Sequence, residues 1–339
     1  MSPDVVISVA IAFLVALAAP FALRPMLSRA GVLDVPNPRS SHSIPVLRGG
    51  GLAQACAIVL ALGYAGIAAT GLDQTLIIVI LATCIAAAVL GWFEDLHGLP
   101  ITIRAGFQFF IGIVATTVVA ANTSNHAWWG LMGGVALLGL INVVNFMDGV
   151  NAISALHGVV AGGSFVVIGS LHEAEWLVVS GAVLAVAFAA FLPWNLSGRM
   201  FLGDVGSYLL GGAIAIVVTV GWMQGLPIIA LAAPMSIYVA DAGVTLLSRI
   251  RAGEQWHEAH RDHTYQRLNR SGFGHVEVAS MVATLSLISA ALGIGASETN
   301  GAVRLGLLSG IALLVLAYTA ARFILGSPDT LIATEKNPS

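Results

Sequence analysis

Carboxylates interrupt the long apolar runs of this chain at four places. Glu94 and Asp95 end one run, Asp148 follows a second, Asp204 precedes a third, and Asp241 lies inside a fourth. Carboxylate oxygens are hard ligands that suit a Mg²⁺ ion held partly by substrate phosphates. Transfer of a phosphoryl group between two anions needs such cations, because the reacting groups repel each other until their charge is screened.

Amide and cationic side chains accompany these carboxylates. Asn142, Asn145 and Asn151 surround Asp148 in the sequence, and two loops carry the remaining candidates, namely His42, Arg48, His260, Arg261 and His263. Arginine and protonated histidine neutralise phosphate and donate hydrogen bonds to it. Together with the carboxylates, this set favours a phosphotransferase.

Each group also has a purely structural interpretation. Asn142 and Asn145 lie three residues apart, so they could donate hydrogen bonds between helices. Asp204 could cap a helix N-terminus as readily as bind a metal, and Asp148–Gly149 could be an ordinary helix end. Asp241 is harder to explain in this way, because a carboxylate at membrane depth is costly and usually functional.

Zinc chemistry is the alternative for the histidine-rich loop. His257-Glu258-Ala259-His260 is one residue short of the spacing that places two imidazoles on one helical face. His257, His260 and His263 recur every third residue, but no cysteine accompanies them, as it often does in zinc sites. Contacts with phosphate and sugar are the better interpretation.

The elements that carry these residues are expected to be membrane-spanning helices. Of 339 residues, 58% are hydrophobic and only 9% are charged, against roughly a quarter charged in soluble domains. The apolar runs are about 18 to 22 residues long, as a helix that crosses the bilayer requires. We therefore predict an all-α, polytopic membrane protein with one domain over residues 1–325 and a short tail over 326–339. The expected spans are 4–23, 51–70, 72–92, 104–121, 128–146, 155–171, 176–194, 205–222, 226–248, 276–295 and 303–325.

The basic residues predict the orientation of these spans, since cytoplasmic loops are enriched in Lys and Arg. One set of loops carries nearly all the arginines, and the opposite set carries Asp73, Glu173, Glu175 and Glu298, with Arg304 as its basic exception. With eleven spans, the N-terminus lies outside and the C-terminal tail in the cytoplasm. Every candidate residue then falls on the cytoplasmic side, and no nucleic-acid partner is expected.

Polar motifs recur along the chain in a fixed order. They begin with Pro36-Asn37-x-Arg39-x-x-His42-x-x-Pro45 and Gly49–Gly50, followed by Glu94–Asp95. The others are Asn142-x-x-Asn145-x-Met147-Asp148-Gly149, Phe201-Leu202-Gly203-Asp204-Val205-Gly206-Ser207, Asp241 and Ala259-His260-Arg261-Asp262-His263-x-Tyr265-Gln266-Arg267. In this order, over about residues 34–275, the motifs resemble those of the bacterial polyprenyl-phosphate N-acetylhexosamine-1-phosphate transferases, and the last loop resembles the O-antigen-initiating branch of that family.

The resemblance implies a reaction in the bacterial cytoplasmic membrane. A UDP-N-acetylhexosamine would donate its sugar-1-phosphate to undecaprenyl phosphate and release UMP. The cofactor would be Mg²⁺, or Mn²⁺ in its place. Asp204 matches the family's metal ligand and Asp95 an aspartate at the reacting phosphates. Asn145, Asp148 and Asn151 match the residues that contact the nucleotide, and the 260–263 loop matches sugar and phosphate binders. We predict Asp95, Asp148 and Asp204 as catalytic, and the substrate-binding set as His42, Arg48, Glu94, Asn142, Asn145, Asn151, Asp241, His260, Arg261 and His263.

Two positions depart from the family pattern. Glu94–Asp95 stands where an Asp-Asp pair is common, and Asn151 replaces a second aspartate after Asp148. The sequence leaves open the sugar, the polymer that is started, and whether the protein works as a monomer or a homodimer. A membrane transporter is the alternative function, but it predicts charged residues near the bilayer midplane and broken helices in symmetric halves.

Overall fold

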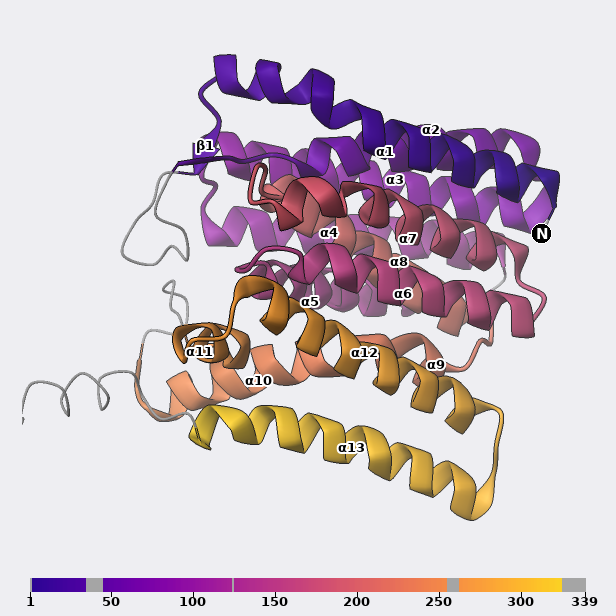
Figure 1. The fold of residues 1–339 in the computed structure, drawn as a ribbon. Coiled ribbons are helices and arrows are strands. Elements are labelled where there is room, and N and C mark those ends of the chain that lie inside the picture. The colour runs from indigo at the N-terminus through magenta and orange to yellow at the C-terminus, as the bar shows by residue number, and fades with distance from the viewer. Residues whose placement is uncertain (1, 35–44, 124, 255–261, 325–339) are drawn as a thin grey trace, which may run out of the picture.

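A computed structural model describes residues 2–34, 45–123, 125–254 and 262–324 of the chain (Figure 1). Eleven stretches of helix among these residues are long and apolar enough to cross a membrane, as the sequence predicted. The protein is therefore an all-α, multi-pass membrane protein. The long helices are α1 (Pro3–Arg29), α2 (Gly51–Ala68), α3 (Gly71–His97), α4 (Ile101–Asn122), α5 (Trp129–Met147), α6 (Ile153–Leu171), α7 (Glu175–Leu196), α8 (Gly203–Met223), α10 (Ser236–Arg251), α12 (His275–Ser297) and α13 (Gly301–Ile324).

The ninth span is interrupted, whereas the sequence predicted one continuous helix. It begins as α9 (Ile228–Ala232), passes through a short 3₁₀ turn, η1 (Ala233–Met235), and continues as α10. Pro234 lies inside this turn, and proline removes a backbone donor and clashes with the preceding helical turn. The proline therefore accounts for the break.

Helix α8 lies at the centre of the bundle and is the most buried span, packed mainly against α3 and α5. Small residues allow this close packing. A Cβ at Gly211 would meet the backbone of Ile141 in α5, and one at Gly91 in α3 would collide with the backbone carbonyl of Asp204. The start of helix α8 is therefore in direct backbone contact with α3.

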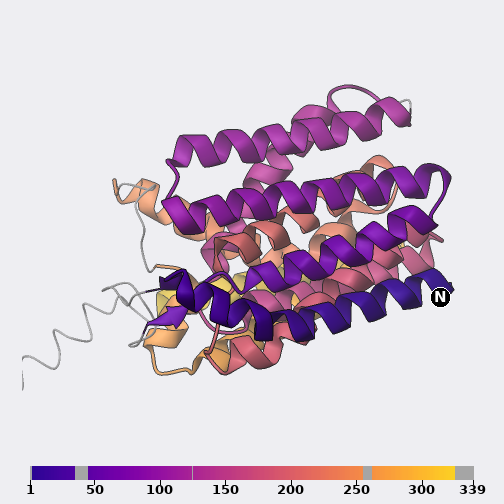
Figure 2. The same ribbon diagram turned by 90° about the horizontal axis from the view of Figure 1, so that it is seen from above.

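The end of α3, the end of α5 and the start of α8, which carry described residues of the predicted site, lie at one end of the bundle, opposite the N-terminus (Figures 1 and 2). The strands β1 (Leu33–Asp34) and β2 (Val46–Leu47) form a small antiparallel pair at this end. The short helix α11 (Thr264–Arg270) lies at the same end. Large apolar side chains such as Phe21 and Leu305 are exposed on the outer faces, as expected for helices that contact lipid.

We expect Gly91→Ala to destabilise the protein, because the added methyl group must push α3 away from the start of α8. Overpacking of this kind costs about 1–3 kcal/mol. Thermal melting of the detergent-solubilised protein measures the loss. Gly63→Ala in α2 is the matched control, because nothing lies within 4 Å of the added methyl there. Equal melting temperatures for the two variants would contradict the close packing.

We also expect the site-bearing end to face the cytoplasm. In a background with Cys56 and Cys84 replaced by alanine, Arg251→Cys marks that end and Asn300→Cys marks the opposite one, since both positions are exposed. A membrane-impermeant maleimide added to intact cells should label position 300 alone and label position 251 only after the cells are opened. The reverse pattern would invert the predicted topology.

Candidate active site

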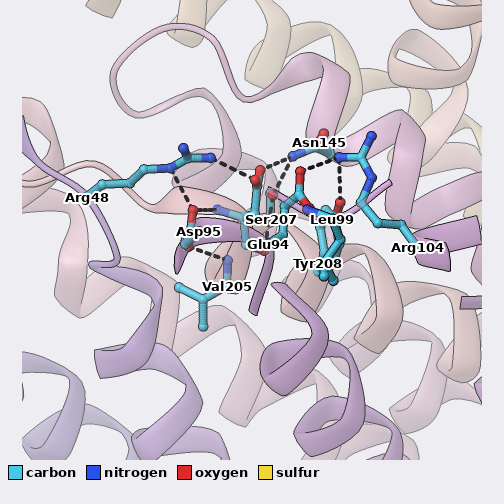
Figure 3. Close-up of polar contacts among 10 residues, drawn as sticks. Arg48, Glu94, Asp95, Leu99, Arg104, Asn145, Val205, Ser207 and Tyr208 are labelled. Atoms are coloured by element: carbon cyan, nitrogen blue, oxygen red, sulfur yellow. Dashed lines mark hydrogen bonds and ion pairs between the residues drawn. The ribbon is translucent and has the colours of Figure 1, made fainter. Parts of the chain in front are cut away.

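Asp95, in the last turns of α3, caps the N-terminus of α8 from outside that helix (Figure 3). Its Oδ1 accepts the backbone N–H of Asp204 at 2.9 Å, and its Oδ2 accepts that of Val205 at 2.9 Å. The first N–H groups of a helix lack partners within the helix, and a carboxylate also favours the positive end of the helix dipole. The Asp95 side chain is fully buried, so this contact fixes where α8 begins.

Arg48 joins Asp95 to Asp204. Its Nε lies 2.6 Å from Asp95 Oδ1 and its Nη2 lies 2.7 Å from Asp204 Oδ2. The loop that carries Arg48 is held by backbone hydrogen bonds, because Phe201 N donates to Leu47 O and Gly50 N to Phe201 O, both at 2.8 Å. The carboxylates of Asp95 and Asp204 would repel each other if the guanidinium of Arg48 did not lie between them. The flanking carboxylates raise the pKa of Arg48 although burial opposes them, so Arg48 is charged at any ordinary pH.

Asp204 itself is held from α5. Asn145 Nδ2 donates to Asp204 Oδ1 at 2.6 Å and to the Ser207 hydroxyl at 3.0 Å. The Asp204 side chain retains 14% exposure, so it reaches solvent at the end of the bundle. The structure thus brings together four predicted residues from three helices and a loop.

Asp148 follows Asn145 by one helical turn and ends α5. Although part of its surface reaches solvent, burial raises the pKa of its carboxyl to about 7. The negative charges of Asp204 and Asp95 raise this pKa further, while the Ser154 hydroxyl and Arg48 oppose the rise. A carboxyl with this pKa is poised to gain or lose a proton near neutrality.

The site carries more negative than positive charge when its carboxylates are ionised. Among the described residues, Asp95, Asp148 and Asp204 are accompanied by one cation, that of Arg48, which leaves an excess of two negative charges that a divalent cation would balance. Within the described residues, no group of three His, Cys, Asp or Glu side chains could hold a metal without other ligands. A Mg²⁺ ion bound at Asp204 would therefore depend on phosphate or water oxygens for most of its ligands, which is its usual behaviour beside phosphates.

Glu94 points away from this cluster. Its Oε1 accepts from Arg104 Nη1 and its Oε2 from the Leu99 backbone N–H, at 2.7 and 2.6 Å. Arg104 also donates to the Tyr208 hydroxyl at 3.3 Å. Glu94, predicted to bind substrate, thus organises the turn between α3 and α4.

Asn142 and Asn151 also form hydrogen bonds within the protein. Asn142 Nδ2 donates to Gln108 Oε1 of α4 at 2.7 Å, the interhelical bond that was the structural alternative for this residue. The backbone N–H of Asn151 donates to His275 Nδ1 at 3.4 Å. Asn145, unlike Asn142, contacts the carboxylate cluster directly.

Asp241 is fully buried and caps α11 in the way that Asp95 caps α8. Its carboxylate accepts the backbone N–H groups of Thr264 and Tyr265, at 2.9 and 3.3 Å. His263 is 4% exposed, and its Nδ1 lies 3.4 Å from Asp241 Oδ1. These two residues, predicted as substrate contacts, hold α11 in place. His42, His260 and Arg261 lie outside the described residues.

An apolar cavity lies beside the interrupted ninth span. Its volume is about 380 Å³. It is lined by Leu140 of α5 and Val218 of α8, together with Ile229, Val239 and Ile311 of the later helices. Leu140 lies two helical turns, about 12 Å, before Asp148 along α5.

The sequence model of glycosyl transferase family 4 matches residues 77–222, the stretch that contains Asp95, Asn145, Asp148 and Asp204. Over this central stretch the chain is similar to glycosyl transferase family 4.

Curated relatives of this chain include two that align over most of both chains. It is 24% identical over 296 residues, 81% of each chain, to a probable undecaprenyl-phosphate N-acetylglucosaminyl 1-phosphate transferase of Bacillus subtilis. It is 25% identical over 308 residues, 77% of this chain and 74% of the relative, to a decaprenyl-phosphate N-acetylglucosaminephosphotransferase of Mycobacterium tuberculosis. A phospho-N-acetylmuramoyl-pentapeptide-transferase of Chlamydia muridarum is 32% identical over 133 residues, 35% of this chain and 37% of its own.

Sequence reasoning missed one residue that shapes the site, Asn195. Asn195, near the end of α7, accepts the Ala152 N–H at 2.7 Å and donates to Met200 O at 3.1 Å. It thereby fixes Ala152, whose φ of 72° is unusual for a residue with a side chain. A lone asparagine at the end of an apolar run was the available signal.

We expect Asp148→Asn to stabilise the cation-free protein at pH 8, and to stabilise it only about a third as much at pH 5. Between the ordinary Asp pKa and a folded value of about 7, the folded state binds more protons than the unfolded state, so wild-type stability falls as pH rises through this window. At about 1.4 kcal/mol per pKa unit, the upper bound on the effect is about 4 kcal/mol. Melting curves of both proteins in EDTA from pH 5 to pH 8 measure it. Parallel pH dependences for the two proteins would contradict the raised pKa.

Proposed function

We propose that this protein transfers N-acetylhexosamine 1-phosphate from a UDP-sugar to undecaprenyl phosphate and releases UMP. The carboxylate and arginine cluster at Asp204 carries this proposal, because its excess negative charge and solvent access suit a divalent cation and phosphates. Relatives across most of the chain carry names of polyprenyl-phosphate sugar-phosphate transferases.

In the proposed reaction, an oxygen of the lipid phosphate attacks the β-phosphorus of the UDP-sugar. The bond between this phosphorus and the bridging oxygen breaks, and the bridging oxygen leaves with UMP. The product is a lipid-linked pyrophosphoryl sugar. Mg²⁺ at Asp204 would screen the phosphate charges during this exchange.

Asp95 is proposed as a positioning residue rather than a base. Its Oδ1 already accepts the Asp204 N–H and pairs with Arg48, and its Oδ2 accepts the Val205 N–H. A carboxylate with both oxygens engaged is poorly placed to take a proton, and an ionised lipid phosphate has none to give up. Direct attack by the lipid phosphate therefore needs no covalent enzyme intermediate.

Arg48 is proposed to bind phosphate as well. Its Nη2 donates to Asp204 Oδ2, the carboxylate proposed as cation ligand. When Asp204 binds a cation instead, this arm of the guanidinium is left to donate to a phosphate oxygen, while Nε keeps its contact with Asp95. Asn145, Asp148 and Asn151 are proposed to face the nucleotide.

The apolar cavity beside the ninth span is proposed to hold part of the prenyl chain of the acceptor. Its lining is almost wholly apolar. Two of the helices that line it, α5 and α8, carry site residues at one end. The site is proposed to face the cytoplasm of a bacterial cytoplasmic membrane, where UDP-sugars are found. From the loop motif that resembles the O-antigen-initiating branch, we propose that the product starts a cell-surface polysaccharide of that type.

A transporter would also use an interrupted helix such as the ninth span. The polar cluster argues against this alternative, because Asp95, Asp148 and Asp204 all lie at helix ends rather than at mid-span.

We expect UMP release that requires undecaprenyl phosphate, a divalent cation and one member of a panel of UDP-N-acetylhexosamines. Asp204→Asn should lower the rate by about 100-fold or more, because it removes the charge proposed to bind the cation. Asp73→Asn is the matched control, since this carboxylate lies at the other end of the bundle. Release that does not depend on the lipid, or no release from any donor by folded protein, would contradict the proposal.

A further inference from the structure

The last helix, α13, is mostly exposed on the outer face of the bundle, with only 17% of its apolar window buried. Its buried residues, Tyr318, Thr319 and Arg322, are polar and gather at its C-terminal end. Figure 1 shows this end beside α10 and α11, at the same end of the bundle as the candidate site. A helix that served only as a membrane anchor would have no use for a buried tyrosine and arginine there, because burial of such groups is costly unless they are bonded.

Tyr318 completes the contacts of Asp241. The Tyr318 hydroxyl donates to Asp241 Oδ2 at 2.7 Å, and both side chains are at least 95% buried. Arg322 Nη1 donates to the Thr245 hydroxyl at 3.2 Å, and Thr245 in turn donates to Asp241 Oδ1 at 3.3 Å. The end of α13 thus supports both oxygens of this carboxylate, one directly and one through Thr245.

Asp241, held by these contacts, in turn holds the start of α11. Its two oxygens accept the N–H groups of Thr264 and Tyr265, the first residues of that helix. A second tie runs directly between the helices, since Arg267 Nη1 donates to the backbone carbonyl of Arg322 at 3.4 Å. The position of α11 therefore depends on contacts from α13.

Helix α11 in turn contacts the turn that carries Asp148. The Tyr265 hydroxyl donates to the backbone carbonyl of Phe146 at 3.0 Å. The space where a side chain at Gly149 would lie is filled by the same hydroxyl, so Tyr265 packs directly against the residues on both sides of Asp148. A shift of α11 would thus displace the Asp148 turn.

We propose that Tyr318 and Arg322 are positioning residues for the nucleotide-sugar side of the site, and that they act through Asp241, α11 and Tyr265 on the Asp148 turn. The expected change in the KM for the UDP-sugar rests on the proposed function, whereas the expected loosening of α11 rests only on the contacts above. It assigns the eleventh span to the active site, although that span contributes no residue to the carboxylate cluster.

Tyr318→Phe tests this inference, because it removes only the hydroxyl. We expect the KM for the UDP-sugar to rise on the order of tenfold, since small displacements of binding groups weaken binding strongly. The KM for undecaprenyl phosphate and kcat should change much less. Thr319→Val is the matched control, because that hydroxyl donates to Val315 O and Leu316 O within α13 and does not reach Asp241.

Tyr265→Phe tests the route. It should raise the donor KM by a similar factor, and Tyr318→Phe added to it should raise the KM little further, because both changes act through one contact. Additive effects on the donor KM would overturn the proposed route. A lower melting temperature for Tyr318→Phe with an unchanged donor KM would show that α13 is an anchor only.

Hydrogen–deuterium exchange tests the structural step without any substrate. The amides of residues 263–270 should exchange faster in Tyr318→Phe than in wild type or Thr319→Val, because α11 loses support. Unchanged exchange would overturn the inference, even in a protein that transfers sugar phosphate. Faster exchange in a protein without transfer activity would leave the positioning of α11 supported and the proposed function contradicted.

Discussion

The capping of α8 by Asp95 is the contact on which the rest of the candidate site depends. Two backbone N–H groups at the start of a buried helix, including that of Asp204 itself, have their partner in a side chain from α3. Because Gly91 lets α3 approach the backbone of Asp204, the cap can form at hydrogen-bond distance. The same contact buries a carboxylate beside a second one, and Arg48 then becomes necessary to balance the charge. The position of Asp204 thus follows from helix packing and charge balance together.

Asp241 caps α11 in the same way. In both cases a fully buried carboxylate on one helix accepts the first N–H groups of another, so the position of the capped helix is set by a second helix of the bundle. A cap supplied by a residue next to the helix would fix only the helix end. A cap supplied from another helix also fixes the distance and angle between the two, which is what a site built from separate spans requires.

The sequence predicted the spans well because bilayer thickness and the cost of charge in lipid leave few alternatives. All eleven were found, and only the break at Pro234 was missed. The order of the motifs also indicated the family. The sequence did not reveal the partners of individual polar residues, because those depend on how each helix is rotated and how closely it crosses its neighbours. Asn142 and Asn145 illustrate this, since residues three apart on one helix meet Gln108 and Asp204 respectively.

The same dependence explains why the departure at Glu94 is compatible with an intact cluster. Adjacent residues of a helix point about 100° apart, so Glu94 and Asp95 cannot both face α8. Asp95 takes that position, and Glu94 faces the α3–α4 turn, where its longer side chain reaches both Leu99 N and Arg104. The departure at Asn151 has a different consequence. Its backbone is held by His275, but its side chain carries no charge beside the donor side of the site. The first departure therefore alters a supporting contact, whereas the second leaves one negative charge fewer close to Asp148 in the sequence.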